Sequence, residues 1–397
     1  MNEQPFQSEY DVVIVGARVA GAATALRLAH GGLRVLVFDK GRYGADTLST
    51  HALMRPAVQL LDRWGVLPAV EEAGTPPVRK TTFWYSDGDE TEVASIDIKP
   101  RHGVDALYAP RRTVLDRALV DAARGAGADV RFGVRLDEVI RDDFGRVSGV
   151  VVRDRNGVRA IRASLVIGAD GRHSRTAALV GAAKYVSGKY ATATAYGYFR
   201  DLPVDGYRWY FRPGMGSGAL PTNADETLVF ASVSRDASSS PSAVRAAFVE
   251  SVVASAPDVG AALEGATLSG RMWFFPGMPG FLRQPWGSGW ALVGDAGYMS
   301  DPITAHGITN ALRDAELLSR VVLEGRPLGA YQLARDHYSE AFFEVSDRMA
   351  SYEWDIPTVQ QYHRIMSREM NREETMIANA VPRLGSMPRG SLDMSAA

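Results

Sequence analysis

The stretch that decides the fold is DVVIVGARVAGAATALRLA, residues 11–29. It opens with a continuous run of β-branched residues, which is typical of a strand buried on both faces of a parallel sheet. The alanine- and leucine-rich second half has helical periodicity and is followed by Gly31-Gly32, a pattern typical of a helix C-cap. A second buried strand, LRVLVFDK (33–40), comes next. Together these segments predict a β-α-β unit of about the usual thirty residues.

The strand and the helix meet at a glycine turn that lacks one glycine. In the nucleotide-binding pattern G-x-G-x-x-G, the second glycine lets the backbone approach a pyrophosphate, while the first and third serve the turn and the packing. Gly16 and Gly21 hold the outer positions, and Arg18 stands in the middle one. The turn fits a dinucleotide site in which Arg18 meets phosphate, and equally a structural corner. Asp39, about twenty residues later, favours the site because such a residue can bind a ribose hydroxyl.

Composition excludes several classes of function. The 44 basic and 46 acidic residues leave a net charge of −2, so nothing indicates nucleic acid or an anionic membrane as a partner. The absence of cysteine excludes disulfides, thiolate metal sites and cysteinyl-flavin links, and we expect no metal. The N-terminus has no signal-peptide pattern, and no apolar run is long enough to span a membrane. We therefore expect a cytoplasmic protein.

Two kinds of segment alternate along the chain. Some combine buried strands with amphipathic helices, and others alternate polar and apolar residues as antiparallel strands do. The predicted fold is therefore α/β, with a Rossmann-like domain, an inserted antiparallel sheet domain for substrate, and C-terminal helices. The boundaries are 9–80, 106–180 and 286–325 for the nucleotide-binding domain, 81–105 and 181–285 for the sheet domain, 326–384 for the C-terminal helical region and 385–397 for a disordered tail.

Two distant motifs extend the nucleotide-site hypothesis. LVIGADGRHSR (165–175) and ALVGDAGYMSDPITAHGITNAL (291–312) each run from a buried strand into a glycine- and aspartate-containing turn. With the N-terminal turn they span about 300 residues. In order and spacing the three resemble the FAD-dependent monooxygenases of the para-hydroxybenzoate hydroxylase type. They also resemble the related flavin-dependent halogenases and geranylgeranyl reductases.

The resemblance implies FAD as the cofactor. The pyrophosphate would lie at a helix N-terminus, where backbone N–H groups and the helix dipole favour anions. Asp295 would bind ribityl hydroxyls, since a carboxylate accepts several hydrogen bonds. Arg112 matches the family's R-x-x-L helix start, with Arg111 as the competing candidate. The implied cofactor-binding residues are Gly16, Ala17, Arg18, Gly21, Asp39, Lys40, Arg42, Thr47, Leu48, Ser49, Arg112, Asp170, Asp295, Pro302, Gly307, Ile308 and Thr309.

Two histidines are candidate catalytic residues near the flavin ring. His51 belongs to the loop that runs along the flavin in the resembling families, and it faces the ring or the substrate, or else has only a structural role. His306 precedes the helix GITNAL, whose first N–H groups could stabilise the negative charge of reduced flavin. It could add a proton or a positive charge there, or simply face solvent at a helix start.

An aromatic strand, GYRWYFRPGMGSG (206–218), is the candidate substrate region. It resembles, with one extra residue, the Y-x-W-x-F-P stretch of the geranylgeranyl reductases and the W-x-W-x-I-P stretch of the halogenases. Alternate side chains share one face of a strand, where they form either a pocket or plain sheet core. The candidate pocket residues are Tyr207, Trp209, Phe211, Trp273 and Phe275, and the candidate anchors for an acidic or phenolic group are Arg101, His102, Arg208 and Arg212.

Three reactions compete on this scaffold. The first is hydroxylation of an aromatic or polyketide-like molecule by NAD(P)H and O2 through a flavin C4a-hydroperoxide, and it is the predicted function. The second is halogenation, for which Lys80 is the candidate catalytic lysine. The third is reduction of a prenyl C=C bond, although that family's cysteine-containing flavin loop is absent. We expect a small aromatic or apolar substrate and a monomer or homodimer.

Overall fold

The largest sheet is built around the strand that opens the chain. The computed structural model describes residues 6–237 and 248–384. Within them, β1 lies between β8 and β2 in an eight-stranded sheet, with β5 and β17 parallel to these strands on either side. The antiparallel strands β6 and β7 extend it from β8. Its strands are β1 (Glu9–Val15), β2 (Val35–Asp39), β5 (Asp129–Phe132), β6 (Arg135–Arg141), β7 (Val147–Asp154), β8 (Gly157–Gly168), β16 (Trp286–Gly287) and β17 (Trp290–Leu292).

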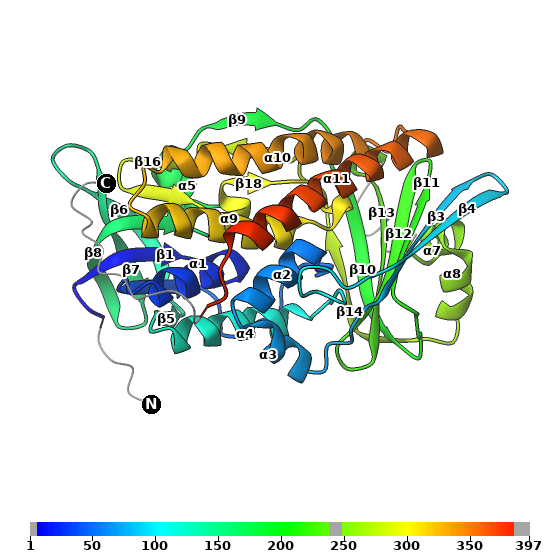
Figure 1. Cartoon of the computed structure of the whole chain (residues 1–397), viewed down its shortest axis with the longest axis horizontal. Helices are drawn as coiled ribbons and strands as arrows, with labels where there is room; N and C mark the ends of the chain where they lie inside the picture. Colours follow the sequence, from blue (N-terminus) through cyan, green and yellow to red (C-terminus); the bar gives the residue numbers. More distant parts are fainter. Residues whose placement is uncertain (1–5, 238–247, 385–397) are drawn as a thin grey trace.

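Helices cover one face of this sheet (Figure 1). The small side chains of α1 allow close contact with the sheet, and α1 packs between α4 and α9. The meander of β6 and β7 packs against the opposite face of β1. Because both faces are covered, β1 is an apolar run rather than an alternating one. The helices of this part are α1 (Val19–His30), α2 (Arg55–Arg63), α3 (Leu67–Glu72), α4 (Arg112–Gly125), α5 (Arg175–Leu179) and α9 (Gly307–Leu323).

A second sheet of seven strands forms the other end of the molecule. Its order is β14-β10-β13-β12-β11-β3-β4, and every pair is antiparallel except β11 with β3. Helices α7 (Phe248–Ser255) and α8 (Pro257–Leu263) pack on its outer face. Its strands are β3 (Lys80–Asp87), β4 (Glu90–Asp97), β10 (Thr192–Arg200), β11 (Tyr207–Arg212), β12 (Met215–Thr222), β13 (Glu226–Ser234) and β14 (Thr267–Phe275).

The last two long helices, α10 (Gly329–Met349) and α11 (Ile356–Ala380), run along both parts of the molecule (Figure 1). They close the inner face of the seven-stranded sheet through a shared apolar cluster. A small third sheet joins β9 (Lys184–Ser187), β15 (Phe281–Arg283) and β18 (Tyr298–Met299). Short 3-10 turns lie at η1 (Arg235–Ala237), η2 (Gly294–Ala296) and η3 (Pro302–Thr304).

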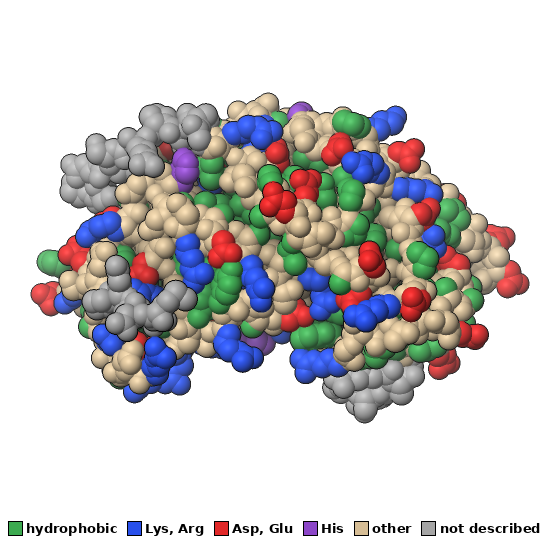
Figure 2. Space-filling model, turned by 90° about the horizontal axis from the view of Figure 1, so that it is seen from below, with side chains coloured by type: hydrophobic (Ala, Val, Ile, Leu, Met, Phe, Trp, Pro, Cys, Tyr) green, Lys and Arg blue, Asp and Glu red, His purple; other side chains and the backbone are tan. Residues whose placement is uncertain are grey.

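The predicted α/β fold with an antiparallel sheet and C-terminal helices is confirmed. Two strands differ from the predicted grouping, because β9 and β15 fall in the segment 181–285 yet pair with each other in the small third sheet instead of joining the seven-stranded sheet. The predicted tail, 385–397, lies outside the described residues. Acidic and basic side chains are mixed over the face shown in Figure 2. Within the described part of the chain, no helix has the length and apolar character needed to cross a membrane.

Candidate functional site

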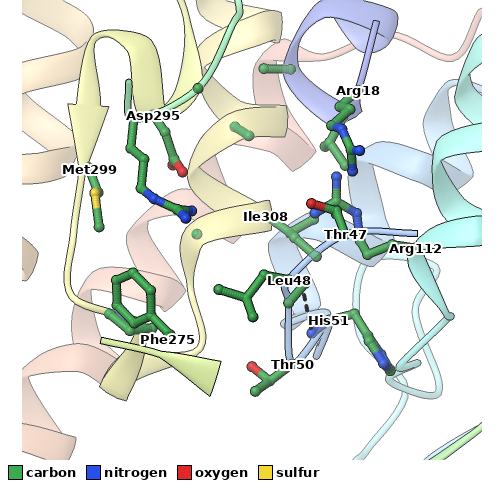
Figure 3. A pocket seen from close by; sticks show the side chains of 18 of the residues that line it. Arg18, Thr47, Leu48, Thr50, His51, Arg112, Phe275, Asp295, Met299 and Ile308 are labelled. Atoms are coloured by element: carbon green, nitrogen blue, oxygen red, sulfur yellow. Dashed lines mark hydrogen bonds between the residues drawn. The ribbon is translucent and has the colours of Figure 1, made fainter. Parts of the chain in front are cut away.

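A cavity of about 550 Å³ is lined by residues from both large sheets. The turn after β1, the starts of α1 and α9, and the loop Thr47–Ala52 line one part of it. Figure 3 shows Arg18 and Arg112 on one side of this part and Asp295 on the other, with Leu48 and Ile308 between them. A cavity of this size is typical of a cofactor or small-molecule site.

The glycine turn has the geometry that its two glycines were predicted to serve. Gly16 has a φ of +105°, and a Cβ there would lie 2.5 Å from the carbonyl oxygen of Ala169. A Cβ on Gly21 would lie 1.7 Å from the carbonyl oxygen of Gly16. Both positions therefore exclude a side chain. The Asp39 carboxylate joins this turn to the end of β2, because it accepts hydrogen bonds from the backbone N–H groups of Ala17 (3.0 Å) and Gly41 (2.6 Å).

Arg18, which replaces the middle glycine, is the N-cap residue of α1 and lines the cavity. Its Nη1 atom lies 3.6 Å from Oδ2 of Asp116, and Arg112 holds the same carboxylate with Nε at 2.9 Å and Nη2 at 3.1 Å. Burial raises the pKa of Asp116, and both guanidinium groups oppose that rise. When Asp116 is ionised, two cations share one anion, which leaves a net positive charge beside the N-terminus of α1, where an anion is already favoured.

The choice between Arg111 and Arg112 is made by their contacts. Arg112 lines the cavity, whereas Arg111 is absent from its lining. Arg111 instead donates to Glu226 (2.7 Å) and Asp46 (3.2 Å), and its guanidinium lies 3.5 Å from the ring centroid of Tyr198. Arg111 therefore has a structural position, and Arg112 is the one that can reach a ligand.

The carboxylates of Asp170 and Asp295, both predicted to bind the cofactor, differ in how many hydrogen bonds the protein donates to them. Asp170 accepts hydrogen bonds from Ser174 Oγ (2.5 Å), Thr176 N (2.9 Å) and Thr176 Oγ1 (3.1 Å), so it shapes the start of α5. Asp295, on the opposite side of the cavity, has no hydrogen-bond donor among the described residues. Burial raises the pKa of Asp295 to about 6, against the lowering effect of Arg172 and Arg112. A partly exposed carboxylate that lines a cavity without a protein partner suits ligand hydroxyl groups.

His51 lines the cavity but is held as a neutral side chain. Its Nε2 lies 3.0 Å from the hydroxyl of Tyr198, and its backbone φ is +44°. Burial, together with the nearby cations Arg111 and Arg112, lowers the pKa of His51 to about 3. A neutral imidazole can accept or donate a hydrogen bond here, but it does not supply a positive charge at neutral pH.

His306 lies outside the cavity lining and is buried, so the solvent-facing alternative is excluded. Its Nε2 is 3.0 Å from Oε2 of Glu373, and its ring packs on Phe342. Burial acts to raise the pKa of Glu373, but His306 and Arg313 hold it below its usual range. His306 therefore belongs to a buried charged network behind the start of α9, and it does not face the cavity.

The other predicted residues divide between the lining and its surroundings. Seven of these residues line the cavity, namely Lys40, Thr47, Leu48, Ser49, Pro302, Gly307 and Ile308, whereas Ala17, Gly21, Arg42 and Thr309 do not.

The structure does not bring Lys80 into the cavity: its Nζ lies 2.9 Å from Oδ2 of Asp205, and the side chain is 41% exposed. Among the described residues, no group of acidic or histidine side chains could hold a metal ion.

The seven-stranded sheet lines the remaining part of the cavity. Trp209, Phe211 and Phe275 line it as predicted, but Tyr207 and Trp273 do not. Trp273 instead stacks on Tyr196 at the neighbouring strand. We call the lining residues of this sheet, together with Tyr352 after α10, the sheet wall. Its members are Thr194, Tyr196, Trp209, Tyr210, Phe211, Gly216, Ser217, Phe230, Ser232, Phe275 and Tyr352.

The predicted anchors for an acidic group point elsewhere. Arg208 donates to Asp205 and Asp258, and Arg212 donates to the carbonyl of Ala254. Both alternate with Trp209 and Phe211 along β11, so they lie on the opposite face of the sheet. Arg101 pairs with Glu374, and His102 is exposed; neither lines the cavity. Two residues that line the cavity, Arg172 and Tyr352, were not predicted from the sequence. Arg172 belongs to the motif LVIGADGRHSR, which could have indicated its position, whereas no motif contains Tyr352.

Comparisons with known proteins agree with this geometry. A family model described as "FAD binding domain" matches residues 9–326. Digeranylgeranylglycerophospholipid reductase 2 of Methanopyrus kandleri is 27% identical over 94% of this chain and 91% of its own length. The structure of the flavin-dependent brominase Bmp2 aligns with a TM-score of 0.73 at 19% identity, covering 96% of each chain. PqsL of Pseudomonas aeruginosa, a probable FAD-dependent monooxygenase, aligns with a TM-score of 0.72 at 22% identity, covering 90% of this chain and 100% of its own. These two structures show a shared fold.

Proposed function

This chain belongs to the family described as FAD binding domain and is an FAD-dependent oxidoreductase, and from this premise we propose that it is a monooxygenase. The proposed reaction uses NAD(P)H and O2 to hydroxylate an aromatic or other apolar small molecule. The observation that carries the proposal is a single cavity lined on one part by the FAD-site residues and on the other by the uncharged sheet wall. Such a cavity would hold cofactor and substrate next to each other.

The residues present fit FAD. The net positive charge of the Arg18, Arg112 and Asp116 group lies beside the N-terminus of α1, as a pyrophosphate requires. Asp295 offers a carboxylate with no protein partner to the hydroxyl groups of a ribityl chain. When bound, FAD supplies the transfer of electrons from NAD(P)H and the activation of O2.

The protein's own contribution would be positioning, exclusion of water and hydrogen bonding. In the proposed reaction, substrate C–H, O2, NAD(P)H and one proton give substrate C–OH, water and NAD(P)⁺. The aromatic sheet wall would hold the substrate in a dry environment, where polar interactions are stronger than in water. Neutral His51 would act as a hydrogen-bonding group from the loop side. Backbone N–H groups at the start of α9, near Gly307 and Ile308, would favour negative charge there.

A second candidate function is reduction of a C=C bond. The observation that favours it is the likeness in sequence to digeranylgeranylglycerophospholipid reductases over most of the chain. Halogenation is less well supported, because the candidate Lys80 is paired with Asp205 away from the cavity.

Product analysis under controlled oxygen tests the proposal. The holoprotein is supplied with NADPH or NADH and a panel of phenols, indoles and prenylated lipids, with and without ¹⁸O2. We expect NAD(P)H consumption and a product that gains one labelled oxygen atom. A product that gains two hydrogens without oxygen would overturn the proposal in favour of the reductase. A halogenated product that depends on added halide would also overturn it.

A further inference from the structure

The short segment between β18 and α9 lines the cavity along most of its length. Its lining residues are Pro302, Ile303, Ala305, Gly307 and Ile308. The segment ends in the first turn of α9, a helix of 17 residues whose N-terminus has no side-chain cap. The first N–H groups of a helix have no partner inside the helix, so those of α9 can donate to a ligand in the cavity. The position of this segment therefore decides where these N–H groups lie.

The backbone is strained in the middle of the segment. Ala305 has a φ of +51°, in the left-handed region that favours glycine. A residue with a side chain stays in that region only where the surrounding structure holds it there. We therefore looked for contacts that fix the chain before and after Ala305.

Asp301 fixes the chain before Ala305. Its buried carboxylate accepts hydrogen bonds from the backbone N–H groups of Ile303 (2.9 Å) and Thr192 (2.8 Å). Because Thr192 is the first residue of β10, this contact ties the beginning of the segment to the seven-stranded sheet.

His306 fixes the chain after Ala305, and it does so from behind the cavity. The residue lies between Ala305 and Gly307, which both line the cavity, but its own side chain is buried outside the lining. Its Nε2 atom lies 3.0 Å from Oε2 of Glu373, a residue of α11, and its ring packs on Phe342 of α10. Two C-terminal helices therefore hold the residue that precedes α9.

Glu373 also holds α9 at a second point. Its other oxygen, Oε1, accepts a hydrogen bond from Nη1 of Arg313, which lies further along α9. Nη2 of Arg313 donates to Ser339 Oγ of α10 (2.9 Å). Glu373, His306 and Arg313 are all buried, so displacing one of them would leave a polar or charged group without a partner in a dry environment. This cost restricts the carboxylate, and with it the start of α9, to one position.

We propose that Glu373 is a positioning residue for the flavin: by holding His306 and Arg313 together, it keeps the N–H groups at the start of α9 toward the cavity. These groups would stabilise the negative charge of reduced FAD. Glu373 would not touch the cofactor, because it lies outside the cavity lining. The inference concerns the bound cofactor alone, so it does not depend on whether the enzyme hydroxylates or reduces its substrate.

Glu373→Asp tests the inference, because this change keeps the negative charge and shortens the side chain by one methylene group. The shorter side chain should not reach His306 and Arg313 together. We expect the affinity for reduced FAD to fall about fivefold more than the affinity for oxidised FAD. For a two-electron couple, this lowers the midpoint potential of the bound FAD by about 20 mV. Spectroelectrochemical titration of the FAD-loaded protein without substrate measures the potential.

Glu316→Asp is the matched control. Glu316 lies nearer the middle of α9, is equally buried, and contacts Arg27 (2.8 Å) and Trp64 (3.3 Å) outside the cavity lining. This variant should lose comparable stability in thermal unfolding and keep the potential of the parent. An equal shift in Glu316→Asp would overturn the inference, because the effect would then follow from destabilisation alone.

His306→Phe is the second variant, and it decides the question if Glu373→Asp fails to fold or to retain FAD. It keeps a ring against Phe342 and removes the contact with Glu373. Its potential should also fall below that of the parent. A potential that stays unchanged or rises in the variants that retain FAD would overturn the inference. Because no substrate is present, failure of the proposed hydroxylation would leave these results unchanged.

Discussion

The Nη1 atom of Arg18 lies 3.6 Å from the carboxylate of Asp116, a residue of α4 that Arg112 also holds. This contact explains how the turn after β1 tolerates an arginine in place of a glycine. The backbone keeps the N-cap conformation of α1, and the long side chain leaves the turn toward α4. Arg18 thereby adds positive charge beside a helix N-terminus instead of blocking it.

Arg18→Ala should weaken FAD binding about three- to tenfold. The effect is moderate because the side chain is 39% exposed, so solvent screens its charge. The difference in FAD affinity between the parent and the variant should be smaller at high salt. Titration of FAD-free protein with FAD measures it, and Arg124→Ala on the exposed side of α4 is the matched control. Unchanged FAD affinity in Arg18→Ala would mean that the arginine is only a tolerated substitute for glycine.

Asp295→Asn should stabilise the FAD-free protein above about pH 6 and weaken its affinity for FAD. Burial raises the pKa of Asp295 from 3.8 to about 6. The protonated side chain therefore stabilises the folded protein fully below pH 4, and this contribution is lost as the pH rises through 6. The loss lowers the free energy of unfolding by up to about 3 kcal/mol. Denaturant unfolding at pH 4 and pH 8, together with FAD titration, measures both effects. Lower stability at pH 8 with unchanged FAD affinity would make the carboxylate structural.

Gly21→Ala should destabilise the protein by about 3 kcal/mol or more. The added Cβ would lie 1.7 Å from the carbonyl oxygen of Gly16, and neither backbone can move without opening the turn. Gly125→Ala, at the end of α4, is the control, because nothing lies within 4 Å of its added Cβ. Its stability should stay equal or rise slightly. Equal stability of the two variants in urea unfolding would refute the close packing of α1 on this turn.

Lys80→Ala should leave FAD content and turnover within about twofold of the parent. Its amine pairs with Asp205 at an exposed position, where such pairs contribute little. Steady-state assays with the substrate found for the parent enzyme measure this. Loss of turnover with normal FAD content and normal thermal unfolding would show that Lys80 takes part in the reaction after all.

His51→Gln should flatten the dependence of stability on pH between about 6.5 and 3. The unfolded chain binds a proton on His51 in this range, whereas the folded protein, with a pKa of about 3, does not. The stability that this group contributes is present above pH 6.5 and is lost as the pH falls toward 3. The slope should fall by up to about 1.4 kcal/mol per pH unit. An unchanged slope in urea unfolding series would show that folded His51 titrates normally.

Much of the FAD-binding part could be predicted because local rules govern it. Gly16 and Asp39 lie at the carboxyl ends of the neighbouring parallel strands β1 and β2, and Gly21 lies in the first turn of the helix between them, so their proximity follows from the β-α-β unit itself. Asp295 follows another such strand, β17, in the same sheet. The substrate part could not be predicted to the same depth. Arg208 is one position from Trp209 and Arg212 is one position from Phe211, and only the packing of the sheet decides which face meets the cavity.

By itself, the sequence determined the α/β class, the strand-turn-helix units and the glycine turn after β1, since each depends on short-range periodicity and steric limits. Only the tertiary structure decided that Arg112 rather than Arg111 lines the cavity, that His306 is buried beside Glu373, and that Lys80 lies outside. It also brought Tyr352 from the end of α10 against a sheet that lies more than 100 residues earlier for most of its strands. Contacts of this kind depend on which surfaces are buried together, and no local pattern encodes that.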